Sequence, residues 1–367
     1  MPEAAIEPLS ADPLSWSDMD MWGWVNAVEK ARAVGGLPNG HPVVAVLSGS
    51  GARPIHIEFS RPGLVADQGW SWDRHYHDEQ AEIVFGSDFV TIRFSVSANK
   101  VLISRSVVML AILRLFANRN ETAGVSIKCS LGDSDGDQPI LCFSSRRFDQ
   151  YLVPDPYFML TRSYEKERKL IEEMWLDPEI RDQRVYWRGA PSGLGKYDDQ
   201  FDSQRVKLVL QANAPNTKPA FNVRFANRNG LEDRVIAALD ACTGFGPPED
   251  QMEIVRYAAN IDVDGVSSSW TGFFLKLLAG GTVIKVASDA GYRQWFYRRM
   301  RAWEHFAEAS ADLSDLGTVC NILRQRSDWA RQIAQSGRAL ALSLDLASQL
   351  DEALPAVDRA IAAAIKA

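Results

Sequence analysis

The chain has 367 residues, of which 46% are hydrophobic and 24% charged, and its net charge at pH 7 is −7. This composition is typical of a globular protein and excludes a disordered chain, and the length predicts two domains. A surface that coats nucleic acid is not expected, because such surfaces gather Lys and Arg. The basic cluster at 293–301 is typical of a solvated helix face.

The N-terminal sequence and the spacing of the cysteines indicate the cellular compartment of the protein. The stretch MPEAAIEPLSADPLSW is acidic and has no apolar core, so no secretory signal is predicted. The apolar run at 107–113 is shorter than the roughly 20 residues that span a bilayer, and the four cysteines form no CxxC pair, which favours reduced thiols. We expect a cytoplasmic protein that can act at the inner face of the membrane, with peripheral contact through 293–301.

Alternating strand and helix patterns in the first half predict an α/β layer. The helix at 163–176 is followed by Asp177-Pro178, which places the domain boundary near 180. The elements expected before it are helix 18–34, strand 42–48, strand 89–96, helix 104–119, strand 124–133 and strand 139–145.

The second half continues the alternation and ends in helices. A strand in RVYWRGAPSG (184–193) breaks into a loop of small residues, a strand follows at 221–226 and a helix near 249–257. Helices are expected to dominate from 291 onward. We therefore predict three segments: an N-terminal domain at 1–180, a second domain at 181–345, and a C-terminal helix at 346–367 that packs back on the first domain.

The stretch NIDVDGVSSSWTGFFLKLLAGG (260–281) predicts a βαβ unit. Trp270, Phe273 and Phe274 begin a helical apolar face that Leu277 and Leu278 continue. Three serines precede this face as N-caps, and a strand at 282–287 follows Gly280-Gly281. Parallel topology places the helix N-terminus at the carboxyl end of its strand, where free N–H groups attract phosphate.

The same stretch allows other interpretations. Asp262 and Asp264 could hold a divalent cation as an Asp-x-Asp pair. With Asn260 as the first position of a calcium loop, position 12 is Thr271 rather than the required Glu, which argues against an EF-hand. A third possible interpretation of this stretch is a capped helix that binds no ligand.

Taken together, several segments resemble glycosyltransferase family 90. They are VYWRGAPSG, YAANIDVDGVSSSWTGFFLKLLAGGTVIKV, GYRQWFYRRMRAWEHF, ADLSDL and IAQSGRAL, in that order. The family contains capsule-associated transferases, lipopolysaccharide-modifying bacterial enzymes and protein O-glucosyl- and O-xylosyltransferases. The resemblance covers roughly 125–345, and the lack of an arginine at Thr271 favours the bacterial branch.

This resemblance implies an α/β protein of GT-B type, in which two Rossmann-like domains face each other across a cleft. The second domain is expected to bind a UDP-sugar and the first a glycan acceptor such as lipopolysaccharide, capsule or a lipid-linked glycan. Transfer inverts the anomeric centre and needs neither a bound divalent metal nor a cofactor. The general base falls on Asp133, which has Asp135 and Asp137 as acidic neighbours.

The resemblance also implies the donor-binding residues. Arg188 is expected to neutralise the departing diphosphate, with Arg205 as a weaker candidate for the same charge. The glycines let the backbone approach the ligand, and the residues before the helix face the phosphates. The expected donor-binding set is Arg188, Gly189, Ser192, Gly193, Arg205, Asp264, Gly265, Ser267, Ser268, Ser269, Trp270 and Lys285.

Two alternatives remain beside this inverting transferase. The first is a metal-dependent transferase that uses Asp262 and Asp264. The second is a non-catalytic relative that binds nucleotide-sugar, which the departure at Thr271 would favour.

Overall fold

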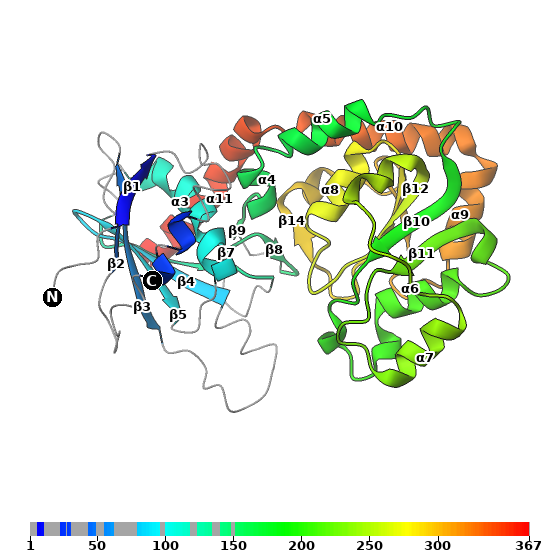
Figure 1. Ribbon diagram of the computed structural model, residues 1–367. Coiled ribbons are helices and arrows are strands. Elements are labelled where there is room, and N and C mark those ends of the chain that lie inside the picture. Colours follow the sequence, from blue (N-terminus) through cyan, green and yellow to red (C-terminus); the bar gives the residue numbers. More distant parts are fainter. Residues whose placement is uncertain are drawn as a thin grey trace. The chain divides into compact units, whose positions relative to one another are not determined.

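The computed structural model describes residues 6–10, 23–26, 28–30, 43–48, 55–61, 79–95, 100–117, 123–133, 140–147 and 151–366 (Figure 1). The chain forms two compact units, Met1–Ser163 with Leu346–Ala367, and Tyr164–Asp345. The second unit begins earlier than the boundary expected near 180, because helix α5 (Glu165–Glu173) packs against α8 (Thr271–Leu278) of that unit. Of the helix expected at 18–34, residues 23–26 and 28–30 are helical and the rest lies outside the described residues, as do Asp135 and Asp137.

The first unit contains an eight-stranded sheet of order β1-β2-β3-β5-β4-β6-β7-β9. Its pairing is mixed, with antiparallel pairs β2–β3, β4–β5 and β4–β6. The strands are β1 (Ile6–Ser10), β2 (Val43–Ser48), β3 (Ile55–Arg61), β4 (Gln80–Phe85), β5 (Val90–Ser95), β6 (Ser126–Ser130), β7 (Leu141–Cys142) and β9 (Tyr151–Leu152), and the unit also holds β8 (Ser144–Ser145).

Mixed pairing differs from the Rossmann-like sheet expected for residues 1–180. The cause is local: β4 and β5 are joined by a short turn in which Gly86 N donates to Phe89 O at 2.8 Å. So short a connection can link only antiparallel strands, because a parallel crossover needs a dozen or more residues. The sequence pattern predicts β5 but not β4.

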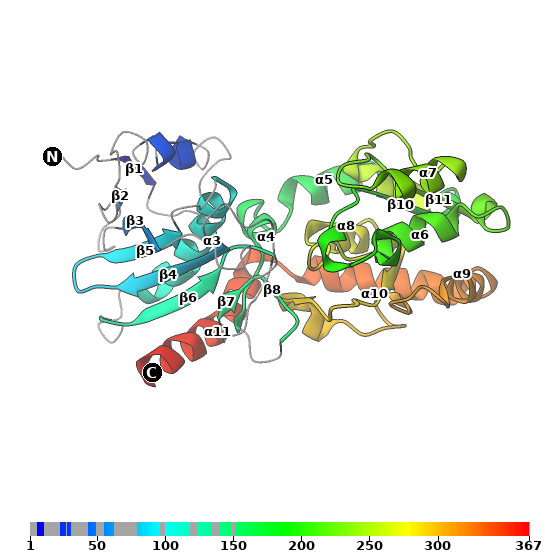
Figure 2. The same cartoon turned by 90° about the horizontal axis from the view of Figure 1, so that it is seen from below.

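Besides the helical residues 23–26 and 28–30, the described part of the first unit contains α3 (Lys100–Ala117), α4 (Pro156–Leu160) and α11 (Leu346–Lys366). Helix α11 packs against α3 and against β6, β7 and β9 (Figure 2). The last helix of the chain therefore belongs to the same unit as the first strands.

The second unit contains a five-stranded, wholly parallel sheet of order β11-β10-β12-β13-β15. The first strand in sequence thus lies second in the sheet, and the chain winds outward from it in both directions, as in doubly wound α/β folds. Its strands are β10 (Asp182–Gly189), β11 (Phe221–Phe225), β12 (Tyr257–Asp262), β13 (Thr282–Val286) and β15 (Ala307–Ala309), with β14 (Arg293–Gln294) outside the sheet.

Helices cover both faces of this sheet, and the expected α/β class is confirmed. Helices α6 and α7 were not predicted from the sequence, and the helix expected near 249–257 is a 3₁₀ helix. The remaining helices are α6 (Gln204–Ala212), α7 (Asp233–Ala241), α9 (Leu316–Gln325) and α10 (Ser327–Ser343), and the 3₁₀ helices are η4 (Leu194–Lys196), η5 (Gln200–Asp202), η6 (Lys218–Ala220), η7 (Gln251–Arg256) and η8 (Trp295–Arg299).

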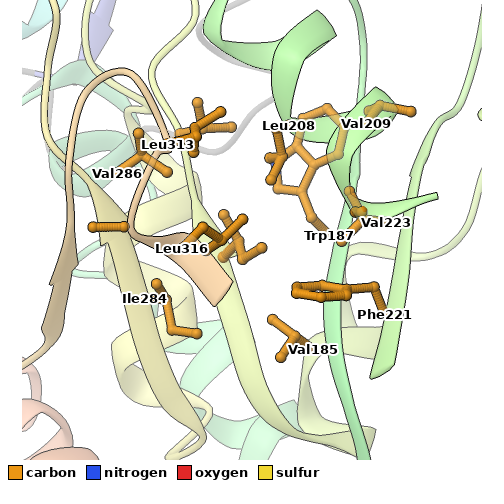
Figure 3. Packing of buried hydrophobic residues seen from close by; sticks show 14 of the residues in the cluster. Val185, Trp187, Leu208, Val209, Phe221, Val223, Ile284, Val286, Leu313 and Leu316 are labelled. Atoms are coloured by element: carbon orange, nitrogen blue, oxygen red, sulfur yellow. The ribbon is translucent and has the colours of Figure 1, made fainter. Parts of the chain in front are cut away.

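Alternation along the strands separates an apolar face from a polar one. Ile284 and Val286 point into a core that also contains Val223 and Leu208 (Figure 3). Lys285 lies between Ile284 and Val286 and points to the opposite face, toward α8. One strand therefore supplies both the core and a buried charge.

Replacing Ile284 by Ala tests this core. Its side chain is fully buried in a central strand, so we expect a loss of about 2–5 kcal/mol of unfolding free energy. The measurement is urea unfolding followed by circular dichroism. Ile180→Ala is the matched control, because Ile180 is 72% exposed and should change stability by less than about 0.5 kcal/mol. Equal losses in the two variants would contradict this assignment of the core.

Candidate functional site

The candidate site lies at the carboxyl end of the second unit's sheet, between β10 and β12. From β10 the chain moves to β11 on one side, then returns past β10 to β12 on the other. The loops that follow β10 and β12 therefore leave the sheet in opposite directions. Ligands of open α/β sheets bind in the crevice at such a switch point.

Arg205, in the first turn of α6, joins these two loops. Its Nε donates to Asp264 O at 2.9 Å, and its Nη1 donates to Ala190 O at 2.7 Å and to Ser192 Oγ at 2.6 Å. Its Nη2 donates to Val263 O at 3.3 Å. One guanidinium thus fixes the loop after β10 against the loop after β12, as a fork of five donors allows.

Glycines allow these loops to touch. Gly193 has φ 77°, and a Cβ there would lie 2.2 Å from Gly265 O. A Cβ on Gly265 would lie 2.6 Å from Ser192 Oγ. Gly189 serves a different contact, because a Cβ there would lie 2.5 Å from the indole of Trp187. Gly193 and Gly265 thus bring the loops together, while Gly189 makes room for the core.

Four charged side chains lie beneath the loops, on the face covered by α8, and three of them, Asp262, Asp264 and Lys285, are buried. Lys285 Nζ lies 2.9 Å from Asp262 Oδ2 and 2.9 Å from Asp264 Oδ1. Lys276 Nζ, from α8, lies 2.8 Å from Asp262 Oδ1. Asp262 and Lys285 are direct neighbours across β12 and β13, and Ser269 Oγ donates to Asp262 at 2.7 Å.

The environment keeps Asp262 and Lys285 charged. Burial alone would raise the pKa of Asp262, but the ammonium groups of Lys276 and Lys285 outweigh it and hold that pKa well below its usual range. Burial would likewise lower the pKa of Lys285, but the carboxylates of Asp262 and Asp264 raise it well above its ordinary value. At neutral pH, Asp262 and Lys285 therefore form an ion pair.

The cluster carries an excess of positive charge. Two carboxylates, Asp262 and Asp264, are bonded to two ammonium groups and interact electrostatically with the guanidinium of Arg205. The carboxylates are thus outnumbered by one cation. A positive excess at the end of a parallel sheet attracts an anion such as a diphosphate.

The start of α8 differs from the expected serine caps. The helix begins at Thr271, and Trp270 is its N-cap residue with no side-chain cap. Ser269 bonds to Asp262, and Ser267 Oγ accepts from Trp270 Nε1 at 3.3 Å. Trp270 has φ 47°, a conformation that costs a non-glycine residue on the order of 1–3 kcal/mol. The serines therefore hold the turn before the helix instead of capping it.

Arg188 is occupied by a carboxylate of the protein. Its Nη2 lies 2.8 Å from Glu249 Oε1 and 3.3 Å from Asn222 Oδ1, and its side chain is 7% exposed. Glu249 also accepts from Tyr186 Oη at 2.7 Å. The prediction that Arg188 neutralises a diphosphate did not foresee this pairing, because Glu249 lies far along the chain.

Asp133, the expected base, follows β6 in the first unit. Arg105 Nη1 from α3 lies 3.4 Å from its Oδ1, and the Asp133 side chain is 25% exposed. The expected site residues thus fall into two groups, Asp133 in one unit and the loop and cluster residues in the other.

Sequence reasoning missed Lys276 and gave Asp262 only a metal-binding interpretation. Lys276 lies one residue after Leu275 on a helix whose other face is apolar, so it looks like an ordinary solvated side chain. Its distance in sequence from Asp262 hides the contact. A lysine between buried leucines on a short helix is the signal that could have found it.

The chain matches no model of a known protein family. It is 25% identical over 93 residues to protein O-glucosyltransferase 3 of Rattus norvegicus, a match that covers 25% of this chain and 18% of that protein. The chain thus spans less than a fifth of the length of this curated relative. A likeness of this extent does not establish family membership.

Three solved structures are similar at low TM-scores. HepE of Anabaena in complex with UDP-glucose has 11% identity and a TM-score of 0.34, with 70% of this chain and 62% of that one covered. WaaG, a glycosyltransferase involved in lipopolysaccharide biosynthesis, has 13% identity and a TM-score of 0.32, with 52% and 50% covered. A glycosyltransferase from Rickettsia africae has 12% identity and a TM-score of 0.36, with 61% and 63% covered. Scores this low do not establish a shared fold.

Replacing Lys285 by Met tests the buried cluster. The change leaves Asp262 and Asp264 buried with fewer cations, which should cost about 3–5 kcal/mol of unfolding free energy. Urea unfolding measures it. Lys207→Met is the matched control, because Lys207 and Asp202 form a pair with side chains 39% and 65% exposed, and its loss should stay below about 1 kcal/mol. A Lys285→Met protein as stable as this control would show that the cluster does not depend on Lys285.

Proposed function

We propose that the chain is a glycosyltransferase of GT-B type that transfers a sugar from a UDP-sugar to a hydroxyl of a glycan acceptor. The observation that carries the proposal is the positive cluster under the joined loops at the switch point of the second unit. A nucleoside diphosphate is the anion that such an edge accommodates, because loop N–H groups and buried cations both favour it. The partial likeness to a protein O-glucosyltransferase supports glucose, or a similar sugar such as xylose, as the group transferred.

In the proposed reaction the Asp133 carboxylate accepts the proton of the acceptor hydroxyl. The acceptor oxygen then forms a bond to the anomeric carbon, the bond from that carbon to the diphosphate oxygen breaks, and UDP leaves with the electron pair. Attack opposite the leaving group inverts the anomeric centre. The excess cation of the cluster stabilises the charge that develops on the diphosphate.

Within the donor site, Asp264 offers a contact for a hydroxyl group. Its Oδ1 is bonded to Lys285, while its Oδ2 is buried and has no hydrogen-bond partner among the described residues. A sugar or ribose hydroxyl would satisfy this acceptor. Ser192, Gly193, Gly265 and the turn before α8 would then surround the diphosphate.

We propose further that transfer needs no divalent cation at Asp262 and Asp264. Both oxygens of Asp262 are bonded to ammonium groups, and one oxygen of Asp264 is bonded to Lys285. A Mg²⁺ ion needs carboxylate oxygens as ligands and would have to displace the lysines. The donor set therefore favours a lysine-compensated site over a metal site.

The acceptor proposed is a bacterial glycan such as lipopolysaccharide, capsule or a lipid-linked precursor, at the cytoplasmic side of the membrane. Among the described residues, no helix combines the length and the apolar character that crossing a bilayer requires. We propose peripheral contact with the membrane through the basic segment at 293–301. Arg298, Arg299 and Arg301 are exposed and would face anionic headgroups.

Replacing Asp133 by Asn tests the proposed base. Amide nitrogen cannot accept the acceptor proton, so kcat should fall by about 100-fold or more, while UDP binding stays unchanged. The assay is UDP release from UDP-glucose with lipopolysaccharide as acceptor, and calorimetry measures UDP binding. Asp88→Asn is the control, because Asp88 is an exposed turn residue of the same unit. Full activity in Asp133→Asn would refute the assignment, and UDP-glucose binding without turnover in the wild type would favour the non-catalytic alternative.

Removal of divalent metal tests the second proposal. After dialysis against EDTA, UDP release should stay within about twofold of the untreated protein, because Lys276 and Lys285 already compensate the carboxylates. A matched sample receives Mg²⁺ or Mn²⁺ after dialysis. Activity that disappears with EDTA and returns with metal would restore the metal-dependent alternative.

A further inference from the structure

Arg105 is fixed at the strand end that carries Asp133. Its Nη1 donates to Leu131 O at 3.0 Å and to Asp133 Oδ1 at 3.4 Å. The arginine side chain is 13% exposed. Because Leu131 lies two residues before Asp133, the guanidinium is anchored to the same piece of backbone as the carboxylate that it faces.

A second carboxyl group packs against this turn. Leu131 N donates to Glu79 O at 2.8 Å, and the side chain of Glu79 lies over Gly132. A Cβ on Gly132 would lie 1.7 Å from Glu79 Cδ, so only glycine leaves room there. Glu79 is 4% exposed, which brings a buried acid next to Asp133.

A third acid, Asp155, interacts with the same guanidinium. Asp155 caps α4, and its Oδ1 accepts from Tyr157 N at 2.9 Å and from Phe158 N at 3.0 Å. Burial raises the pKa of Asp155 to about 7, although those N–H groups and the charge of Arg105 act in the opposite direction. Its Oδ2 is buried without a hydrogen-bond partner among the described residues.

The other elements packed on β6 present no buried charge to this turn in the described residues. Helix α11 buries Gln349, Ala353, Ala356, Val357, Ala360 and Ile361, and β7 consists of Leu141 and Cys142. Lys128, on β6 itself, is exposed. Within the described part of the chain, Arg105 and Glu79 contact this turn, and Asp155 interacts with the Arg105 guanidinium.

We propose that Arg105 is a positioning residue for sugar transfer, which holds the Asp133 carboxylate in the orientation and charge state in which it accepts the acceptor proton. The proposal rests on the proposed function of Asp133. An acid beside other acids tends to keep its proton, whereas an opposite charge within about 4–6 Å favours the carboxylate. Arg105 supplies that opposite charge, and its bond to Leu131 O fixes where the charge lies.

The test compares Arg105→Gln with Arg105→Lys. In the Gln variant kcat for UDP release from UDP-glucose with lipopolysaccharide should fall about 10- to 100-fold, while KM for UDP-glucose changes little. The acid limb of the kcat profile should move to higher pH by about one unit, since the opposite charge is gone. Arg105→Lys keeps the charge, so its acid limb should stay in place. Arg93→Gln is the control, because Arg93 pairs with Glu58 at 2.8 Å on the same sheet and should retain wild-type kinetics.

Three outcomes decide the proposal. A Gln variant with wild-type kcat and an unmoved acid limb overturns it, provided that Asp133→Asn is inactive. If Asp133→Asn is active, the proposed base itself fails and Arg105 loses its function with it. If the thermal midpoint shows that Arg105→Gln is unfolded, Arg105→Lys decides. A lowered kcat with an unmoved acid limb in that variant supports the proposal, because lysine keeps the charge but not the fixed geometry. A wild-type kcat, or an acid limb at higher pH, contradicts it.

Discussion

The ion pair between Asp262 and Lys285 is the interaction on which the second unit's candidate site depends. Both side chains leave neighbouring strands on the face opposite the apolar core, and both are buried. Burying either side chain without the other would cost several kcal/mol of unfolding free energy, because its charge would be unpaired. Lys276 takes the other oxygen of Asp262, so the turn, the helix α8 and strand β13 meet at one carboxylate. The Asp262 carboxylate therefore fixes the carboxyl end of the sheet, and the cations around it outnumber the carboxylates.

The loops after β10 and β12, above this ion pair, are held together by Arg205. Arg205 uses backbone carbonyls as acceptors, so its hydrogen bonds do not cancel its charge. Carbonyl oxygens orient the guanidinium and the glycines at 193 and 265 bring the two loops into contact. The site is thereby preorganised, which is the condition under which fixed charges stabilise a developing anion most effectively. Arg188 differs from Arg205, because it forms an ion pair with a carboxylate, that of Glu249.

Helices and strands that show a regular apolar pattern could be predicted from the sequence. Contacts between residues far apart in the sequence could not. The βαβ unit at 257–286 was readable because apolar residues repeat along one helix and two buried strands flank it. The partners of Arg188 and Lys276 were not readable, since no local pattern connects either residue to Glu249 or Asp262. The mixed sheet was not predicted for a related reason. Strand β4 alternates between buried and half-buried residues, but its antiparallel pairing with β6 joins segments far apart in the sequence.

Each unit holds one arginine near a carboxylate at the end of a strand by hydrogen bonds to main-chain carbonyls. Arg105 is held by Leu131 O beside Asp133, and Arg205 is held by Asp264 O and Ala190 O beside the Asp262 cluster. In each case a main-chain carbonyl fixes the guanidinium without neutralising it. Lysine, with a flexible stem and a point charge, would supply the charge but not the fixed geometry.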